Sequence, residues 1–470
     1  MNSGGVGFLK EQLLAAVRGK PADYVEVRVE DSKVTQIILR GPNLDNVGQN
    51  VSYGGCVRAL VNGGWGFASF NSLDDLPAKV DRAIENARAT AAAQRDKEKV
   101  ILAPVPVVVD EVRVEVEGSK DPRRIPLAEK VKVFQDYNGI ILSYGKPISS
   151  SSVSYVEKSS RVVFANSEGT YIDQEKVDLG GSIGAIAAGD GHTQVARVGF
   201  GGSLGFDVCL GLEDQVRRAV KVAGELVGAP TVKGGEYTVI LDPRLAGIFA
   251  HEAFGHLSEG DNVHENPNLA KIMKLGEKFG RDILSIYDTG LDKGARGYLK
   301  YDDEGVPTEK TYLIKDGVLV GRLHSRETAG KMGEKATGNA RALDYRFPPI
   351  CRMRNTSIQG GKAAFEDMLE GVKLGIYCKD SYGGETMGEM FTFSAGECYM
   401  IRDGKLAELV RDVNLTGNVF NTLKNIDMVG ADFCSYEAGG GCGKAGQGPL
   451  PTSEWAPHVR IQKVVVGGKG

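Results

Sequence analysis

Apolar and polar positions along the first 230 residues follow two different periods. Apolar side chains three or four residues apart predict helices, and alternation at every second residue predicts strands. The predicted helices are 7–17, 75–93, 127–136 and 212–227, and the predicted strands are 24–30, 34–39, 51–60, 151–156, 161–165 and 177–188. We therefore expect an N-terminal α+β domain at 1–230, built from antiparallel strands and long helices, with two subregions at 1–95 and 100–230.

A linker that contains glycine and proline, at 228–235, separates this domain from the rest of the chain. An Asp-Gly pair between two apolar runs predicts a β-hairpin, and such pairs occur at Asp316-Gly317 and Asp403-Gly404. One further helix is predicted at 363–372. The fold class is therefore α+β, with a strand-rich C-terminal domain at 236–470.

The most informative stretch of the C-terminal region is His251-Glu252-Ala253-Phe254-Gly255-His256, which uses two of the 6 histidines in the chain. An apolar strand is predicted at 237–241, directly before it. Asp242 and Pro243 then provide an N-cap and a first-turn proline for a helix that we predict at 244–256. Two imidazoles on such a helix can hold a metal ion, and the carboxylate between them can act on water bound to that ion.

The spacing of the two histidines departs from the usual HExxH pattern of zinc peptidases. Histidines four residues apart lie about 40° apart around a helix, whereas five residues place them about 140° apart. Two ligands for one ion therefore require a π-bulge, a kink or a helix end between His251 and His256. Gly255 is the residue at which we expect this departure. The alternative is that the two are unrelated helix histidines, one buried and one exposed.

A catalytic zinc site normally has three protein ligands and one free position, so a third ligand is needed. Proximity along the chain favours Glu259, Asp261 or His264, and His324 is a further candidate. Ligand chemistry favours Cys442, because a thiolate suits zinc and the glycines around it let the backbone fold tightly. The alternative is a glycine loop that contains a small apolar cysteine without a role in metal binding.

Composition is that of an ordinary enzyme of two or three domains. The formal net charge of -4 and the pI near 6.0 argue against a nucleic-acid-binding surface. No apolar run approaches the roughly 20 residues of a membrane span. The 7 cysteines have no disulfide-like spacing, and the first residues lack the features of a signal peptide. We therefore expect a reducing, cytoplasmic compartment and neither nucleic acid nor membrane as a partner.

Together, the motif at 251–261 and the distant Gly441-Cys442-Gly443-Lys444 resemble the TldD/PmbA family. Members of this family are assigned as zinc metallopeptidases and are also labelled modulators of DNA gyrase. The strand entry at 236–243, Arg352-Met353-Arg354-Asn355-Thr356 and the segment 457–461 are similar to the family as well. The similarity covers nearly the whole chain and is strongest in its C-terminal half.

The resemblance implies roles for four residues. In TldD-type members the two motif histidines and the late cysteine bind Zn²⁺, which corresponds to His251, His256 and Cys442 here. The motif glutamate, here Glu252, is the general base that acts on metal-activated water. PmbA/TldE-type members lack these residues and form the inactive half of a heterodimer. This chain keeps all four and so resembles the active TldD-type subunit, as a homodimer or as a heterodimer with a PmbA/TldE-like subunit.

The activity implied by the resemblance is hydrolysis of small, extended or unfolded peptides, with family roles in microcin maturation and antitoxin turnover. The alternative is a catalytically silent scaffold, or a modulator of gyrase or of toxin–antitoxin systems that acts by protein contacts. A purely structural zinc would need a fourth protein ligand and would have no use for Glu252.

Three basic residues lie within or near these motifs. Arg352 and Arg354 are candidates for binding a carboxylate or carbonyl of a peptide substrate. The alternative is that they are exposed arginines at a strand edge. Lys444 follows Cys442 by two residues, and the sequence leaves its role open.

Overall fold

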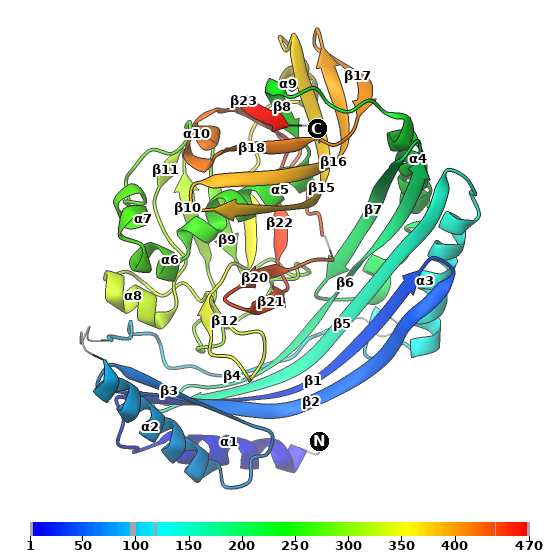
Figure 1. The fold of residues 1–470 in the computed structure, drawn as a ribbon. Coiled ribbons are helices and arrows are strands. Elements are labelled where there is room, and N and C mark those ends of the chain that lie inside the picture. The colour runs from blue at the N-terminus through cyan, green and yellow to red at the C-terminus, as the bar shows by residue number, and fades with distance from the viewer. Residues whose placement is uncertain (1–2, 95–99, 117–119, 438, 468–470) are drawn as a thin grey trace.

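The computed structural model describes residues 3–94, 100–116, 120–437 and 439–467. A long curved sheet from the N-terminal half bends around the C-terminal half, which lies on its concave face (Figure 1). Helices cover the outer face of the sheet. This arrangement confirms the predicted α+β class. The division into domains at 1–230 and 236–470 stays a prediction, and both predicted N-terminal subregions contribute strands to the one sheet.

The N-terminal sheet has the strand order β3-β2-β1-β5-β6, and β4 and β7 both pair with β6. The prediction of separate strands at 24–30 and 34–39 was wrong, and so was that at 151–156 and 161–165. The polar residues between them contain neither glycine nor proline, and they continue the ladder on both sides of β1. The strands are β1 Tyr24–Arg40, β2 Asn43–Val61, β3 Gly64–Phe70, β4 Val109–Val112, β5 Ile148–Asn166, β6 Tyr171–Gly189 and β7 His192–Gly202.

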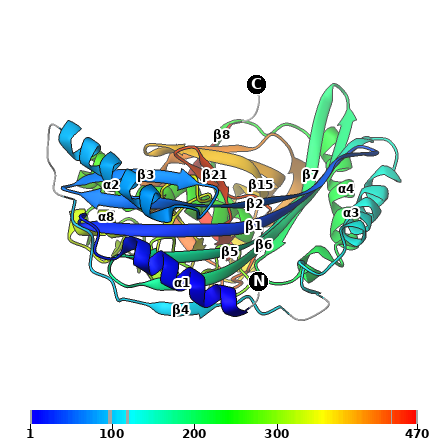
Figure 2. The same cartoon turned by 90° about the horizontal axis from the view of Figure 1, so that it is seen from below.

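The two faces of this sheet have different partners. Along β1, Val25, Val27 and Val29 pack against the first two helices, and Ile37 and Leu39 pack against the last two. Alternate residues of a strand point to opposite faces, so the even-numbered side chains of β1 face the C-terminal half. The helices, seen on the outer face in Figure 2, are α1 Ser3–Val17, α2 Leu76–Ala93, α3 Leu127–Leu142 and α4 Glu213–Gly228.

The C-terminal half contains a seven-stranded and a five-stranded sheet, ordered β15-β8-β23-β18-β16-β17 with β19 on β23, and β11-β10-β9-β14-β22. Helix α5, Pro243–Ala250, contacts strands of both sheets. The strands of the larger sheet are β8 Gly235–Leu241, β15 Leu374–Met387, β16 Met390–Arg402, β17 Lys405–Val410, β18 Asn414–Asn418, β19 Ile426–Val429 and β23 Val459–Gly467. Those of the smaller sheet are β9 Ile286–Thr289, β10 Lys310–Lys315, β11 Val318–Leu319, β14 Asn355–Ile358 and β22 Ser453–Trp455.

Both predicted hairpins are confirmed, because Asp316-Gly317 joins β10 to β11 and Asp403-Gly404 joins β16 to β17, all four residues with positive φ. The predicted helix at 363–372 is shorter, since Ala364 is extended and Gly371 has positive φ. The remaining elements are α6 Gly260–Glu265, α7 Pro267–Ile272, α8 Arg326–Met332, α9 Phe365–Leu369, α10 Val419–Lys424, β12 Ala340–Arg341, β13 Ile350–Cys351, β20 Cys442–Lys444 and β21 Gln447–Leu450. Within the described ranges, no helix is long and apolar enough to cross a bilayer.

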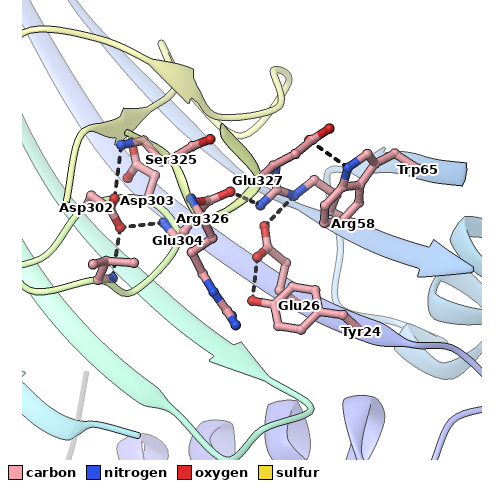
Figure 3. A network of polar contacts seen from close by, with 12 residues as sticks. Tyr24, Glu26, Arg58, Trp65, Asp302, Asp303, Glu304, Ser325, Arg326 and Glu327 are labelled. Carbon is pink, nitrogen blue, oxygen red and sulfur yellow. Dashed lines mark hydrogen bonds and ion pairs between the residues drawn. The ribbon is translucent and has the colours of Figure 1, made fainter. Parts of the chain in front are cut away.

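A buried polar network fastens the C-terminal half to the concave face (Figure 3). The Arg58 guanidinium of β2 donates to Glu26 of β1 at 2.8 Å and to Glu304 at 2.5 Å. The second carboxylate oxygen of Glu304 accepts from the Arg326 backbone N–H at 2.8 Å. Removing one partner of such a network leaves a buried charge uncompensated, so the network holds the two halves in one relative position.

Candidate metal centre

Helix α5 leads into the motif and ends directly before His251, the first candidate ligand. Asp242 Oδ1 accepts from the Leu245 backbone N–H at 2.9 Å, which caps α5. From His251 to Gly255 the backbone is π-helical, and the His256 N–H donates to the His251 carbonyl, five residues back. The wider turn rotates the second imidazole toward the first, and the ring centroids lie 5.2 Å apart. Of the three departures that the spacing required, a π-bulge, a kink or a helix end, the structure contains the π-bulge.

Gly255 is the position at which this turn requires glycine. A Cβ built there would overlap the Sδ of Met353, and Met353 is fully buried. Gly255→Ala should therefore lower the free energy of unfolding by about 1–3 kcal/mol, the usual cost of overpacking a core. The measurement is the midpoint of chemical denaturation.

The control for that variant is Gly139→Ala in α3, where an added Cβ meets nothing within 4 Å. Because alanine favours a helix over glycine, this control should be neutral or slightly stabilising. Equal midpoints for Gly255→Ala and wild type would show that Met353 can move aside.

Cys442 brings the third donor from a segment far along the chain. One ligand atom from each of His251, His256 and Cys442 lies within 4.8 Å of the others. Cys442 Sγ is 3.4 Å from His256 Nε2. Two imidazole nitrogens and one sulfur form the donor set that zinc prefers.

Each imidazole also contacts a carboxylate through its other nitrogen. His256 Nδ1 forms a hydrogen bond with Glu259 Oε2 at 3.1 Å, whereas His251 Nδ1 lies at ion-pair distance, 3.3 Å, from Glu454 Oε1 without the geometry of a hydrogen bond. Carboxylates in this position fix the orientation of a metal-binding imidazole and raise its basicity. Glu454 lies in β22, and no sequence motif pointed to it.

The other candidates for the third ligand have different partners. The ammonium of Lys444 lies 3.0 Å from Glu259 and 2.7 Å from Asp261, so both carboxylates are held by a cation. The His324 ring is 3.1 Å from Glu334. His264 lies in α6 and is outside the group of three. Lys444, whose role the sequence left open, thus links the cysteine strand to the carboxylate that contacts His256.

Burial and charge set the protonation of the three candidate ligands. Burial by itself would raise the pKa of the Cys442 thiol, but hydrogen bonds and charge from His251 and His256 outweigh it and bring the pKa to about 4. Burial would lower the pKa of His251, yet Cys442 and then Glu454 raise it to about 9. The sulfur is therefore a thiolate at neutral pH, the form that binds metal ions.

Glu252 lies outside the ligand group and lines an adjacent cleft of ≈ 370 Å³. Its Oε2 is 3.9 Å from His256 Nε2, and burial raises the pKa of this carboxyl above its ordinary value. The cleft runs between the concave sheet face and α5, and Arg197 and Tyr382 also line it. The carboxylate can thus reach a water molecule or a peptide beside the metal ligands.

The cap of the motif helix gives stability a pH dependence. Burial, then the charge of Asp380, raises the pKa of Asp242 from 3.8 to about 7. Because the pKa of Asp242 is raised in the folded state, its carboxyl contributes fully to the free energy of unfolding below pH 3.8. This contribution is lost as pH rises through 7. Asp242→Asn keeps the cap but cannot ionise. Its free energy of unfolding should therefore exceed that of wild type by roughly 2–4 kcal/mol between pH 5 and 8. The measurement is the midpoint of chemical denaturation at several pH values. The same pH dependence in wild type and Asp242→Asn would contradict this prediction.

The structure buries both candidate substrate-binding arginines. The side chains of Arg352 and Arg354 are 0% and 1% exposed, so the alternative of exposed strand-edge arginines was wrong. Arg352 donates to the backbone carbonyls of Cys442 at 2.6 Å and Gln447 at 2.9 Å. It therefore fixes the strand of the candidate thiolate ligand, and neither arginine lines the cleft beside Glu252.

Three family models match the chain. They describe PmbA/TldA metallopeptidase domain 1 at residues 25–91, the central domain at 120–227 and the C-terminal domain at 234–468. The chain belongs to the TldD/PmbA family. Among its TldD/PmbA relatives, a metalloprotease of Synechocystis sp. is 45% identical over 447 residues, which are 95% of this chain and 95% of that protein. A zinc metalloprotease TldD homologue of Saccharolobus solfataricus is 29% identical and covers 95% of this chain and 97% of its own.

Solved structures share this TldD/PmbA fold. The TldE protein of Thermococcus kodakarensis superposes with a TM-score of 0.74 at 20% identity, over 99% of both chains. A protein of Bacteroides thetaiotaomicron described as a modulator of DNA gyrase gives a TM-score of 0.77 at 20% identity, over 100% of both chains. At these identities the likeness establishes the fold alone.

Proposed function

We propose that this protein is a zinc-dependent peptidase that hydrolyses small, extended or unfolded peptides. The observation that carries the proposal is the group of two imidazoles and one thiolate beside a carboxylate in an accessible cleft. A fourth protein ligand would indicate a structural ion, and the described residues offer none within this group. The relatives named metalloproteases support the same reaction class.

In this proposal His251, His256 and Cys442 would hold the ion, and Glu259 and Glu454 would orient the two imidazoles. Zinc held there would supply Lewis acidity and would acidify a water molecule toward neutral pH. Glu252 accepts the proton of the attacking water and then delivers it to the leaving amine, because it lies next to the ligands without being one of them.

The size of the cleft favours unfolded peptides over folded proteins as substrates. A cleft of ≈ 370 Å³ between a sheet and a helix admits a few residues of an extended peptide and excludes a folded domain. We further propose that the protein works in the cytoplasm, as a homodimer or with a TldE-like subunit. The structural likeness to TldE supports the second arrangement.

The experiment is to measure zinc per chain by mass spectrometry and to incubate the loaded protein with unstructured peptides and with a folded protein. We expect about one zinc per chain and cleavage of the peptides only, abolished by a chelator and restored by Zn²⁺. Loaded protein that cleaves no peptide, alone or with a TldE-like partner, would favour the silent scaffold.

A further inference from the structure

A second cleft, of ≈ 240 Å³, lies on the concave face between the N-terminal sheet and the C-terminal half. Its apolar walls come from both sides. The sheet contributes Val34, Val156 and Val162, and the C-terminal half contributes Leu343, Leu450 and Pro451. Val156 is 40% exposed on the floor of this cleft. An apolar side chain left in contact with water in a concavity is typical of a ligand-binding surface.

The strand register places this cleft next to the metal centre. Val156 stands directly opposite Gly180, and Ser154 stands opposite Ser182, which lines the cleft of Glu252. The two clefts therefore follow one another along β6, with Asp178 in the wall of one and Ser182 in the wall of the other. Gly439 and Gly440 line both.

Backbone without side chains separates the two clefts. We call this the ridge, and it is formed where Gly439 and Gly440 cross Gly180 of β6. A Cβ on Gly180 would lie 3.2 Å from the Cα of Gly439, so the two chains cross at contact distance without side chains between them. Arg296 pairs with Asp178 of β6 at 2.8 Å and also donates to the Gly440 carbonyl, which fixes the ridge on the sheet. Gly439 precedes Cys442 by three residues, at most about 11 Å of chain.

The cationic side chains around this cleft have hydrogen-bond or ion-pair partners within the protein. Lys158 lies 2.7 Å from Glu30, and Lys176 lies 3.1 Å from Asp303. Arg341 donates to the backbone carbonyls of Met353 and Pro451. The two lysines therefore already have a carboxylate partner and Arg341 is held by backbone carbonyls, so the apolar wall is the surface that a ligand would gain most by covering.

We propose that this cleft is a subsite for one apolar side chain of the peptide substrate, two to four residues from the scissile bond. An extended peptide advances about 3.3 Å per residue. Gly180, opposite Val156, stands two strand positions from Ser182 in the cleft of Glu252, and this offset is the basis for the position of the subsite. The inference rests on the proposed peptidase function and adds a preference for apolar side chains at one position.

The test uses octapeptide pairs that differ by Leu or Asn at one position, from two to four residues on either side of the cleaved bond. We expect wild type to show a KM roughly tenfold lower for Leu at one of these positions, the usual scale of apolar discrimination. Val156→Asp should abolish that difference, while zinc content stays unchanged.

Val47→Asp is the matched control. Val47 is 42% exposed and pairs with Ile37, so it lies on the opposite face of the same sheet, away from the cleft. This variant should discriminate like wild type. If Val156→Asp fails to fold, Val156→Trp fills the cleft with an apolar group and should raise KM for the Leu peptide alone.

Binding of the same peptides to the zinc-loaded Glu252→Gln protein, followed by fluorescence anisotropy, separates the two proposals. Leu-dependent affinity that Val156→Asp removes supports the subsite even if wild type hydrolyses nothing, in which case only the peptidase function fails. Equal affinity or KM for Leu and Asn at every position in wild type, or discrimination that survives in Val156→Asp, would overturn the subsite.

Discussion

Glu252→Gln should retain one zinc per chain and lose peptide hydrolysis by roughly 10³-fold. The amide has nearly the shape of the carboxylate but cannot accept a proton, and general acid–base catalysis contributes about 10²–10⁴-fold. Zinc should stay, because Glu252 lies outside the group of three donors. The measurement is kcat/KM on one peptide, together with metal content by mass spectrometry.

The control for this variant is Glu265→Gln, an exposed carboxylate at the end of α6. It should hydrolyse peptides like wild type. Glu252→Gln protein that is loaded with zinc and keeps more than a tenth of wild-type activity would remove Glu252 from the role of general base.

Cys442→Ser should lower zinc affinity by more than roughly 100-fold and lose hydrolysis together with the metal. Even residues that only orient a ligand change metal affinity about 10–100-fold, and Cys442 offers the one anionic donor of the group. A serine hydroxyl stays neutral at pH 7, whereas charge from the imidazoles keeps the Cys442 thiol ionised, with a pKa of about 4. Competition with a chromogenic chelator measures the affinity.

Cys434→Ser provides the comparison, because Cys434 is the exposed cysteine among the 7 and lies outside the metal group. It should bind zinc as tightly as wild type. If Cys442→Ser remained fully loaded, the third donor would have to come from a neighbouring carboxylate, and Glu259, beside His256, would be the next residue to replace.

Local sequence patterns predicted most helices and strands. The predictions failed where contacts between distant parts of the chain determine the structure. Periodicity located α2 within a residue, and Asp-Gly pairs located two hairpins. The same periodicity divided β1 at Asp31-Ser32-Lys33, because a polar triplet resembles a turn. In the structure those residues pair with β2 on one side and β5 on the other, and β5 lies far away in the sequence.

The candidate site shows the same division. His251, Glu252 and His256 are close in sequence, and their spacing called for a π-bulge, a kink or a helix end, of which the structure contains the first. Glu454 and Arg352 could not be assigned, because their contacts with His251 and Cys442 arise only when β22 and the loop before β14 pack against the motif. No local pattern marks a residue whose partner is 90 or more positions away.

Strand β23 has a consequence for the order of events during synthesis. It follows every other strand of the larger sheet in the chain, yet it lies between β8 and β18, and β8 leads directly into α5. A ribosome must therefore release residue 467 before that sheet can close, and Cys442 emerges 186 residues after His256. A nascent chain thus has both histidines long before it has Cys442, so the candidate metal centre is complete only once this region has been translated.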